Sequence, residues 1–198
     1  MSRPKMEFWY EFASSYSYLS VMRIEALAGQ AGVEVAWRPF LLGPVFLAMG
    51  WNDSPFNIYP PKGRYMWRDL ARLAGKYDLP FRLPSRFPRS GLLAARVALL
   101  GVEPGWVAAF SRAVMLANFA EDREIGETGV IAGILDDLGL PAQELLALAV
   151  SEENKAALRR QTELASELGL FGAPSFRVGE ELFWGNDRLE DALAWAQR

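Results

Sequence analysis

The residues most able to do chemistry lie near the N-terminus, where Ser14 and Ser17 are spaced like the two cysteines of a Cys-x-x-Cys redox site. Such a site lies where a strand leads into a helix, because the helix N-terminus stabilises a thiolate. Here an apolar, strand-like run over 6–12 precedes the serines, and an amphipathic segment follows them. The chain has no cysteine, so any thiol chemistry at this site needs a thiol that another molecule brings. The plainer role for Ser14 is to cap the helix, with its hydroxyl accepting a backbone N–H.

A proline near the C-terminus belongs to a second candidate motif, Phe171-Gly172-Ala173-Pro174-Ser175-Phe176. The motif follows a long helical pattern and opens an apolar strand. In thioredoxin-like folds a cis-proline at this place faces the Cys-x-x-Cys position, and the residue before it pairs through its backbone with a bound peptide. We therefore predict a cis bond between Ala173 and Pro174, the alternative being an ordinary trans turn.

Polar residues at two other places could bind the charged ends of a ligand. Asn186 and Asp187 follow the last apolar strand and could bind an ammonium group, while backbone N–H groups there bind a carboxylate. Asp187 with Glu190 also resembles a capping box for the last helix, which is the simpler interpretation. Asn52 and Lys62 lie in a loop and at the following helix start, where a lysine indicates either an anion site or a solvated surface.

The composition excludes several classes of function. The 198 residues include no histidine and no cysteine, so the chain has no histidine-based triad, no disulfide and none of the usual zinc ligands. A net charge of -3 gives no reason to expect nucleic acid or an anionic membrane as a partner. No apolar run approaches the ~20 residues of a membrane span, and no signal core follows the N-terminus. We expect a cytoplasmic protein without a metal.

The expected elements run β-α-β, then a block of helices, then β-β-α, which predicts an α/β, thioredoxin-like fold with an inserted all-helical domain. Strands are expected over 6–12, 33–37, 175–178 and 181–184. Helices are expected from 14 to a glycine cap at 29 or 32, from about 62 to 77, and over 91–100, 104–120, 128–138, 141–149, 151–168 and 188–197. A loop rich in Gly, Pro and Asn is expected between 43 and 61. The thioredoxin-like domain would take 1–44 and 168–198, and the helical domain 45–167.

Four stretches together closely resemble the 2-hydroxychromene-2-carboxylate isomerase family, relatives of the kappa-class glutathione transferases in the DsbA-like branch of the thioredoxin superfamily. They are Phe12-Ala13-Ser14-Ser15-Tyr16-Ser17-Tyr18-Leu19, Lys62-Gly63-Arg64-Tyr65-Met66, Phe171-Gly172-Ala173-Pro174 and Phe183-Trp184-Gly185-Asn186-Asp187-Arg188-Leu189. The resemblance spans nearly the whole chain. It implies a thioredoxin-like domain with a helical insertion, a homodimer, and glutathione as the thiol.

The resemblance also implies roles for individual residues, with Ser14 as the catalytic serine. The implied glutathione site consists of Lys62, the backbone of Ala173 beside Pro174, Asn186 and Asp187 around the γ-glutamyl end, and Asn52 as a looser match. Two positions depart from the family pattern, with Glu11 where Asp is usual and Ser15 where Pro is usual. The first alters a carboxylate near the site, and the second loosens the first helical turn and adds a hydroxyl beside Ser14.

The implied reaction begins with Ser14 donating a hydrogen bond to the glutathione thiol, which lowers the pKa of that thiol. The thiolate adds to an α,β-unsaturated cyclic hemiketal, the ring opens, a carbon–carbon bond rotates, and expulsion of the thiolate leaves the trans benzylidenepyruvate. The substrate is a small aromatic carboxylate, which needs a cation and an apolar wall. Candidates for its pocket are Ser17, Trp51, Tyr65 and Trp184, with Phe56 and Trp67 as further aromatic candidates.

Two other functions remain open at this point. A kappa-type glutathione transferase or peroxidase would use the same Ser14 and the same glutathione pocket. A glutathione- or peptide-binding module without turnover would also keep these residues. The pocket for the electrophile separates the three, and its shape does not follow from the sequence.

Overall fold

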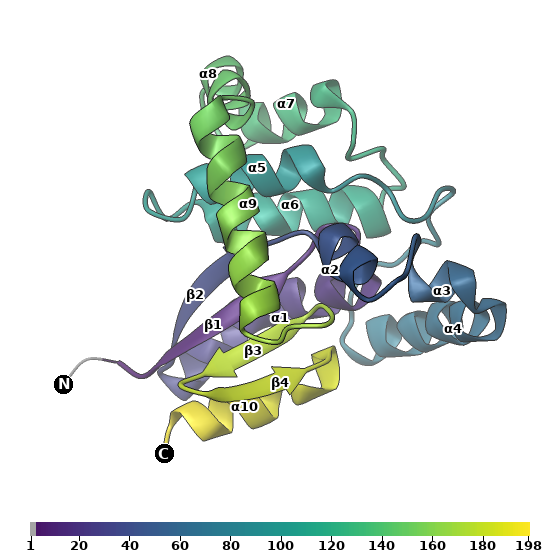
Figure 1. Ribbon diagram of the computed structural model, residues 1–198. Coiled ribbons are helices and arrows are strands. Elements are labelled where there is room, and N and C mark those ends of the chain that lie inside the picture. Colours follow the sequence, from purple (N-terminus) through teal and green to yellow (C-terminus); the bar gives the residue numbers. More distant parts are fainter. Residues whose placement is uncertain (1–2) are drawn as a thin grey trace.

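A four-stranded sheet brings the two ends of the sequence together. The computed structural model describes residues 3–198 and places the strands in the order β2-β1-β3-β4. The strands are β1 (Lys5–Tyr10), β2 (Glu34–Pro39), β3 (Ser175–Val178) and β4 (Glu181–Trp184). β1 runs parallel to β2 and antiparallel to β3, and β3 and β4 form the hairpin expected around Gly179. Strands from opposite ends of the chain thus lie side by side, which confirms the thioredoxin-like topology (Figure 1).

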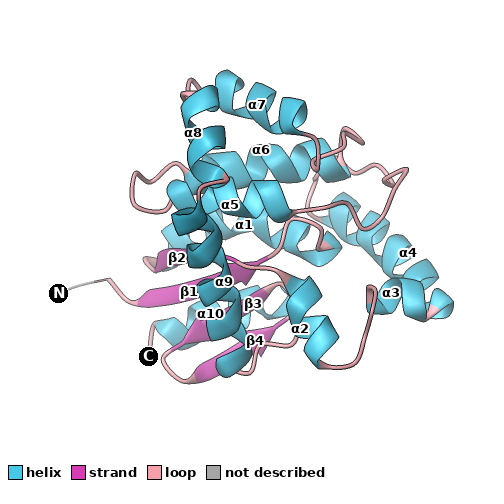
Figure 2. Ribbon diagram, turned by 45° about the horizontal axis from the view of Figure 1, so that its top comes forward, coloured by secondary structure: helices cyan, strands magenta, loops and turns pink. Residues whose placement is uncertain are grey.

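Helices cover both faces of the sheet. Side chains of β1 alternate between two apolar clusters, Phe8 and Tyr10 in one and Trp9 in the other, because successive side chains of a strand point to opposite faces of the sheet. Helices α1 (Ser15–Ala31) and α10 (Leu189–Ala196) lie behind the sheet, and α9 (Glu152–Glu167) crosses its front (Figure 2). Helix α1 ends at Gly32, which has φ 66° and accordingly takes the left-handed cap conformation that glycine favours.

The helical block expected between the second and third strands is confirmed. Its helices are α4 (Pro60–Lys76), α5 (Leu92–Leu100), α6 (Val107–Phe119), α7 (Thr128–Asp137) and α8 (Ala142–Ala149), and α9 closes it. Helix α6 begins at Val107 and not at Pro104, because Pro104 and Gly105 form a turn first. Among residues 3–198, none of the helices has both the length and the apolar composition that crossing a membrane requires.

The segment expected as a loop between 43 and 61 contains two short helices, so that expectation is wrong in part. Helix α2 (Leu42–Ala48) buries Val45 in the cluster of Trp9 and Phe40. Helix α3 (Pro55–Ile58) is capped by Ser54, whose hydroxyl accepts from the N–H of Phe56. Tertiary burial stabilises α2, and a local cap stabilises α3, so irregular structure is confined to about 49–54.

The sheet and the inserted helices share one continuous apolar core. The hydroxyl of Tyr10 on β1 lies 2.7 Å from that of Ser111 on α6, and burial raises the pKa of Tyr10. Phe12, just after β1, packs edge-on against Phe110 of α6 with ring centres 6.2 Å apart. Each fully buried aromatic side chain stabilises the fold by about 1.5–3 kcal/mol. The turn after β1 is therefore anchored in the core that the sheet shares with α6.

Candidate active site

Ser14 is both the cap of α1 and a link to the far end of the chain. Its backbone is extended, with φ -77° and ψ 116°, and its Oγ accepts from the N–H of Ser17 at 3.2 Å. The same hydroxyl donates to the carbonyl oxygen of Ala173 at 2.9 Å. The capping role is therefore confirmed. It coexists with a position at the junction of two motifs that are 159 positions apart.

The loop before β3 has the backbone conformation predicted for it. The Ala173-Pro174 peptide bond is cis. Pro174 is buried, and its carbonyl accepts from the N–H of Gly185 at 2.9 Å, which ties the loop to the end of β4. Within residues 3–198, the N–H of Ala173 donates no hydrogen bond. One donor of this loop is thus available beside the Ser14 hydroxyl.

Glu11 lies beneath the Ser14 turn and is 8% exposed. One carboxyl oxygen accepts from the N–H of Ala13 at 3.0 Å. Burial raises the pKa of Glu11 to about 8, against the opposing effect of hydrogen bonds from the Ala13 and Ser14 amides. The other oxygen faces Gly91, where a Cβ atom would lie only 2.6 Å away. The carboxyl group is accordingly neutral at neutral pH, and glycine at position 91 leaves room for it.

Helix α4 docks on the first turn of α1 through the two residues after Ser14. The buried hydroxyl of Ser15 donates to the sulfur of Met66 at 3.0 Å. The hydroxyl of Tyr16 donates to Oδ2 of Asp69, also at 3.0 Å. The extra hydroxyl that Ser15 brings in place of a proline is therefore bonded to the inserted helices.

Two buried polar residues that the sequence did not single out hold the turn from the other side. Asn118 on α6 donates to the carbonyl of Phe12 at 3.0 Å, and its own Oδ1 accepts from Arg89 at 3.0 Å. Arg89 is 4% exposed and pairs with Asp122, whose pKa falls to about 2 because the Ser85 amide and Arg89 bind its carboxylate. A chain of hydrogen bonds thus runs from an ion pair in the helical block to the backbone beside Ser14.

The residues proposed for the substrate pocket differ in exposure. Ser17 is fully buried, and its Oγ accepts from the N–H of Glu11 at 3.5 Å, so it supports the turn from within. Trp184 is 54% exposed and packs edge-on against Phe171, with ring centres 4.9 Å apart. Its indole nitrogen lies 2.4 Å from the place of an added Cβ at Gly172, so a larger residue there would force the ring away from this loop. Trp184 therefore forms an exposed aromatic surface beside Ala173.

Asn186 and Asp187 lie in a 3₁₀ turn, Asn186–Arg188, between β4 and α10. The Oδ1 of Asn186 accepts from Ser20 and Arg23 at 3.1 and 3.2 Å, while its buried Nδ2 has no partner among residues 3–198. The side chain of Asp187 is 73% exposed and lies 3.4 Å from Arg188. The expected capping box is wrong: α10 begins at Leu189 without a side-chain cap, because the 3₁₀ turn takes the place of a capping residue.

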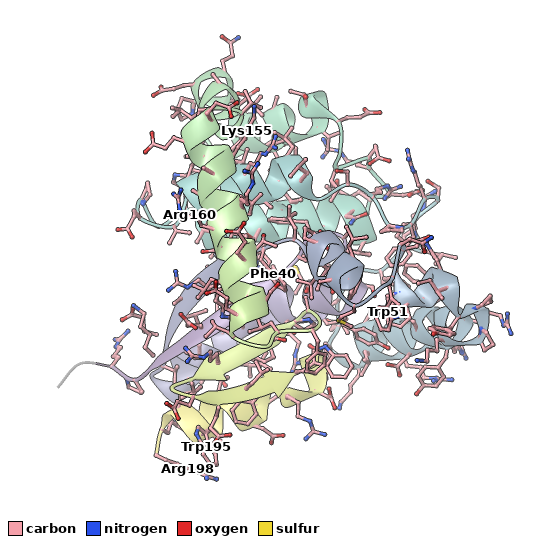
Figure 3. The ribbon with its side chains drawn as sticks, in the orientation of Figure 1. Phe40, Trp51, Lys155, Arg160, Trp195 and Arg198 are labelled. Atoms are coloured by element: carbon pink, nitrogen blue, oxygen red, sulfur yellow. The ribbon has the colours of Figure 1, made fainter. Side chains whose placement is uncertain are left out.

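The remaining candidates come from the segment around α3 and α4. Lys62 is exposed, with Nζ 4.9 Å from the ring centre of Tyr59, and Asn52 is exposed in the loop after α2. Tyr65 is 62% exposed. Trp51 is half-buried against Phe46 and lies beside α2 (Figure 3). In the described part of the chain none of these joins the hydrogen bonds of Ser14, so their roles toward a ligand stay predictions.

Comparison with known proteins shows both the fold and the family. Residues 5–194 match the family model of a DsbA-like thioredoxin domain. The chain is 30% identical over 186 residues to a 2-hydroxychromene-2-carboxylate isomerase from Sphingobium xenophagum, covering 93% of this chain and 94% of that one. It is 25% identical to glutathione S-transferase kappa 1 from Rattus norvegicus, covering 93% and 87%.

A solved structure of a 2-hydroxychromene-2-carboxylate isomerase superposes on this fold with a TM-score of 0.86 at 27% sequence identity, covering 96% of this chain and 95% of the other. Sequence and structure agree over almost the full length, so the match does not depend on one motif. The chain belongs to the DsbA-like thioredoxin family, in the group that contains the 2-hydroxychromene-2-carboxylate isomerases and the kappa-class glutathione transferases.

Proposed function

We propose that this protein is a glutathione-dependent isomerase that converts 2-hydroxychromene-2-carboxylate-like substrates to trans-o-hydroxybenzylidenepyruvate-like products. The observation that carries the proposal is the pairing of Ser14 with Ala173, which puts a hydroxyl at a helix N-terminus beside a backbone N–H that donates to no group within residues 3–198. No sulfur is present in this turn, so the site suits a thiol that arrives with a ligand. Three curated isomerases of this name match 93% of the chain, which supports the choice of reaction.

The groups around the site fit a peptide-like thiol with charged ends. The free N–H of Ala173 can donate to a peptide carbonyl, as an added strand would require. The buried Nδ2 of Asn186 lacks an acceptor, and a ligand carboxylate would satisfy it. Exposed Lys62 and Asp187 supply one charge of each sign for the ligand termini. These observations support glutathione as the cofactor.

Ser14 has a defined task in this proposal. Bound glutathione supplies a thiolate that adds to the unsaturated ring of the substrate and leaves again, so that no thiol is consumed. The Ser14 hydroxyl turns from Ala173 to donate to the sulfur, and the N-terminus of α1 adds the favourable end of its dipole. Glu11 is neutral at neutral pH and so puts no opposing negative charge beneath the sulfur.

The aromatic surface beside Ala173 suits a planar substrate. Trp184 and Phe171 are both exposed and packed against each other, which leaves their outer faces open to an aromatic ring. A bicyclic substrate lying there would hold its reactive carbon near the sulfur. We assign Trp184 to the substrate wall on this basis.

A kappa-type glutathione transferase or peroxidase is the second candidate. Kappa transferases from rat, human and nematode match over 93–94% of this chain at 23–25% identity. They support the same thiol site, because Ser14 and its helix serve conjugation as well as isomerisation. A glutathione- or peptide-binding module without turnover is a further alternative, which the relatives named as isomerases and transferases favour less.

The deciding experiment counts thiol during turnover. The protein is supplied with a chromene carboxylate, or with a standard aryl halide, at limiting glutathione. An isomerase turns over the chromene many times per glutathione with no loss of free thiol, whereas a transferase consumes one thiol per product. Fast stoichiometric thiol loss with the halide and no chromene turnover would establish the transferase instead. No turnover of either, with glutathione still bound, would indicate the binding module.

A further inference from the structure

A cavity of about 270 Å³ lies between α2, α5 and α9, and in the described part of the chain none of the hydrogen-bond partners of Ser14 lines it. Three leucines in its lining, Leu41, Leu92 and Leu158, give it an aliphatic surface, which we call the leucine wall. Pro44, within α2, also lines the cavity. An aliphatic wall of this kind buries the apolar part of a ligand and offers it no hydrogen bond.

Three cationic side chains also line the cavity. Arg96 comes from α5, and Lys155 and Arg159 come from successive turns of α9. Lys155 is paired with Glu152 at 2.8 Å, but within residues 3–198 neither Arg96 nor Arg159 has a carboxylate within ion-pair distance. In the described part of the chain neither guanidinium group thus has an ion-pair partner, although the charges of both help Lys155 to lower the pKa of nearby Glu152.

Arg96 carries a further sign of an absent partner. Its Nε is buried and makes no hydrogen bond in the structure. Buried polar atoms without a partner are uncommon, and a ligand or an ordered water normally satisfies them. Glu163 also lines the cavity. It is exposed, and within residues 3–198 it forms no ion pair with either arginine.

We propose that this cavity binds a small organic carboxylate, with the carboxylate on Arg96 and Arg159 and the apolar body on the leucine wall. Two guanidinium forks match a planar carboxylate, since each offers parallel N–H donors. An inorganic anion would leave the leucine wall unused, and a neutral apolar molecule would leave the arginines unpaired. This inference does not depend on the function proposed for Ser14.

The cavity is separate from the Ser14 site, but backbone segments that line the cavity adjoin residues that support the Ser14 turn. Leu92 directly follows Gly91, which packs on Glu11. The N–H of Leu41 donates to Oγ1 of Thr162, another residue of the cavity lining, at 3.3 Å. β1 and β2 are parallel, so Leu41 lies at the same edge of the sheet as the Ser14 turn. The amides of Leu41 and Leu92 are therefore local reporters for a ligand in this cavity.

The test uses cinnamate, a carboxylate on a flat apolar body, and cinnamamide as its uncharged counterpart. Titration of the full chain is followed by calorimetry and by amide NMR shifts. We expect cinnamate to bind, to shift the Leu41 and Leu92 amides, and to weaken with added salt, and we expect cinnamamide not to bind. Arg159→Gln and Arg96→Gln should each weaken binding by about tenfold or more, since each removes a charge-assisted hydrogen bond.

Arg160→Gln is the matched control. Arg160 neighbours Arg159 on α9 and is exposed, but it does not line the cavity; Figure 3 shows Lys155 and Arg160 leaving α9 on different sides. Arg160→Gln and Ser14→Ala should both bind cinnamate as the unaltered chain does. Equal binding of the amide, unchanged affinity in Arg159→Gln, or loss of binding in Ser14→Ala would each overturn the proposal. A lack of binding at millimolar cinnamate would overturn it as well.

Discussion

The Ser14 hydroxyl lies 2.9 Å from the carbonyl oxygen of Ala173, so the N-terminal cap of α1 and the loop before β3 form one structural unit. Both partners of this hydrogen bond have other tasks. Ser14 also accepts from the N–H of Ser17, and the N–H of Ala173 donates to no group in the described part of the chain. A ligand that takes the Ser14 hydrogen therefore replaces a bond between two motifs, while the cap remains.

Replacing Ser14 by alanine should raise the pKa of bound glutathione and lower turnover. One charge-assisted hydrogen bond to the thiolate is lost, worth about 1.5–3 kcal/mol. The thiolate absorbance of the complex, followed against pH, gives the pKa, and the rate follows from the chromene assay. Ser151→Ala is the control, because Ser151 caps α9 in the same way without contacting the site. If the two variants changed the thiol pKa and the turnover rate equally, Ser14 would act only as a helix cap.

Because the buried carboxyl group of Glu11 is stable only when it is protonated, the free energy of unfolding should fall as the pH rises. The unfolded carboxyl releases its proton near 4.5 and the folded one near 8, so the folded state binds more protons between these values. The stability that protonated Glu11 contributes is fully present below about pH 4.5 and is lost as the pH rises through about 8. Between these values the free energy of unfolding falls by up to about 1.4 kcal/mol per pH unit.

Glu11→Gln tests this effect, because an amide has no proton to lose in this range. Urea unfolding should give the variant its largest relative gain at about pH 9, and the gain should shrink toward about pH 5. Glu180→Gln, at an exposed hairpin turn, should leave the pH profile unchanged. A Glu11→Gln profile parallel to that of the unaltered chain would mean that the buried carboxyl titrates normally.

Gly91→Ala should destabilise the site, although alanine favours helices. The added Cβ would lie 2.6 Å from a carboxyl oxygen of Glu11 and 3.1 Å from the Cβ of Phe12, so the turn below Ser14 must shift. A loss of about 1–3 kcal/mol is expected in thermal unfolding, with slower turnover. Gly29→Ala provides the contrast, because its Cβ would meet nothing within 4 Å inside α1, and it should raise stability by about 0.5–1 kcal/mol.

Local patterns in the sequence predict the parts of the fold that local forces determine. The apolar run that predicts β1, the Ser14 cap and the glycine that ends α1 all depend on neighbours within a few residues, and all three are confirmed, although β1 ends at Tyr10 and not at 12. Asp187 shows the limit, because the same Asp-x-x-Glu spacing occurs in a capping box and in this 3₁₀ turn. Helix α2 was missed for a related reason, since the burial of Val45 against distant residues stabilises it.

The candidate site follows the same division. Ser14 and Ala173 belong to recognisable motifs, so their meeting could be expected from the sequence. Asn118 and Arg89 belong to none, and only the packing of α6 against the turn brings them to Phe12. Gly91 likewise has no local signal for its contact with Glu11. Such residues are found when buried polar groups are traced to their partners.

Asn118→Ala, a substitution in the helical block, should therefore destabilise the turn that carries Ser14. The substitution leaves the Phe12 carbonyl without a donor and frees a guanidinium N–H of buried Arg89, at a cost of about 1–3 kcal/mol. Because Phe12 is two residues from Ser14, we also expect a higher thiol pKa in the glutathione complex, a change that general loss of stability would not produce. Asn57→Ala is the control, since Asn57 is exposed and bonds mainly to Asp53, and it should change stability by less than about 0.5 kcal/mol. Urea unfolding and the pH titration of thiolate absorbance measure the two effects separately.

A large loss of stability with an unchanged thiol pKa would show that Asn118 supports the core and does not position Ser14.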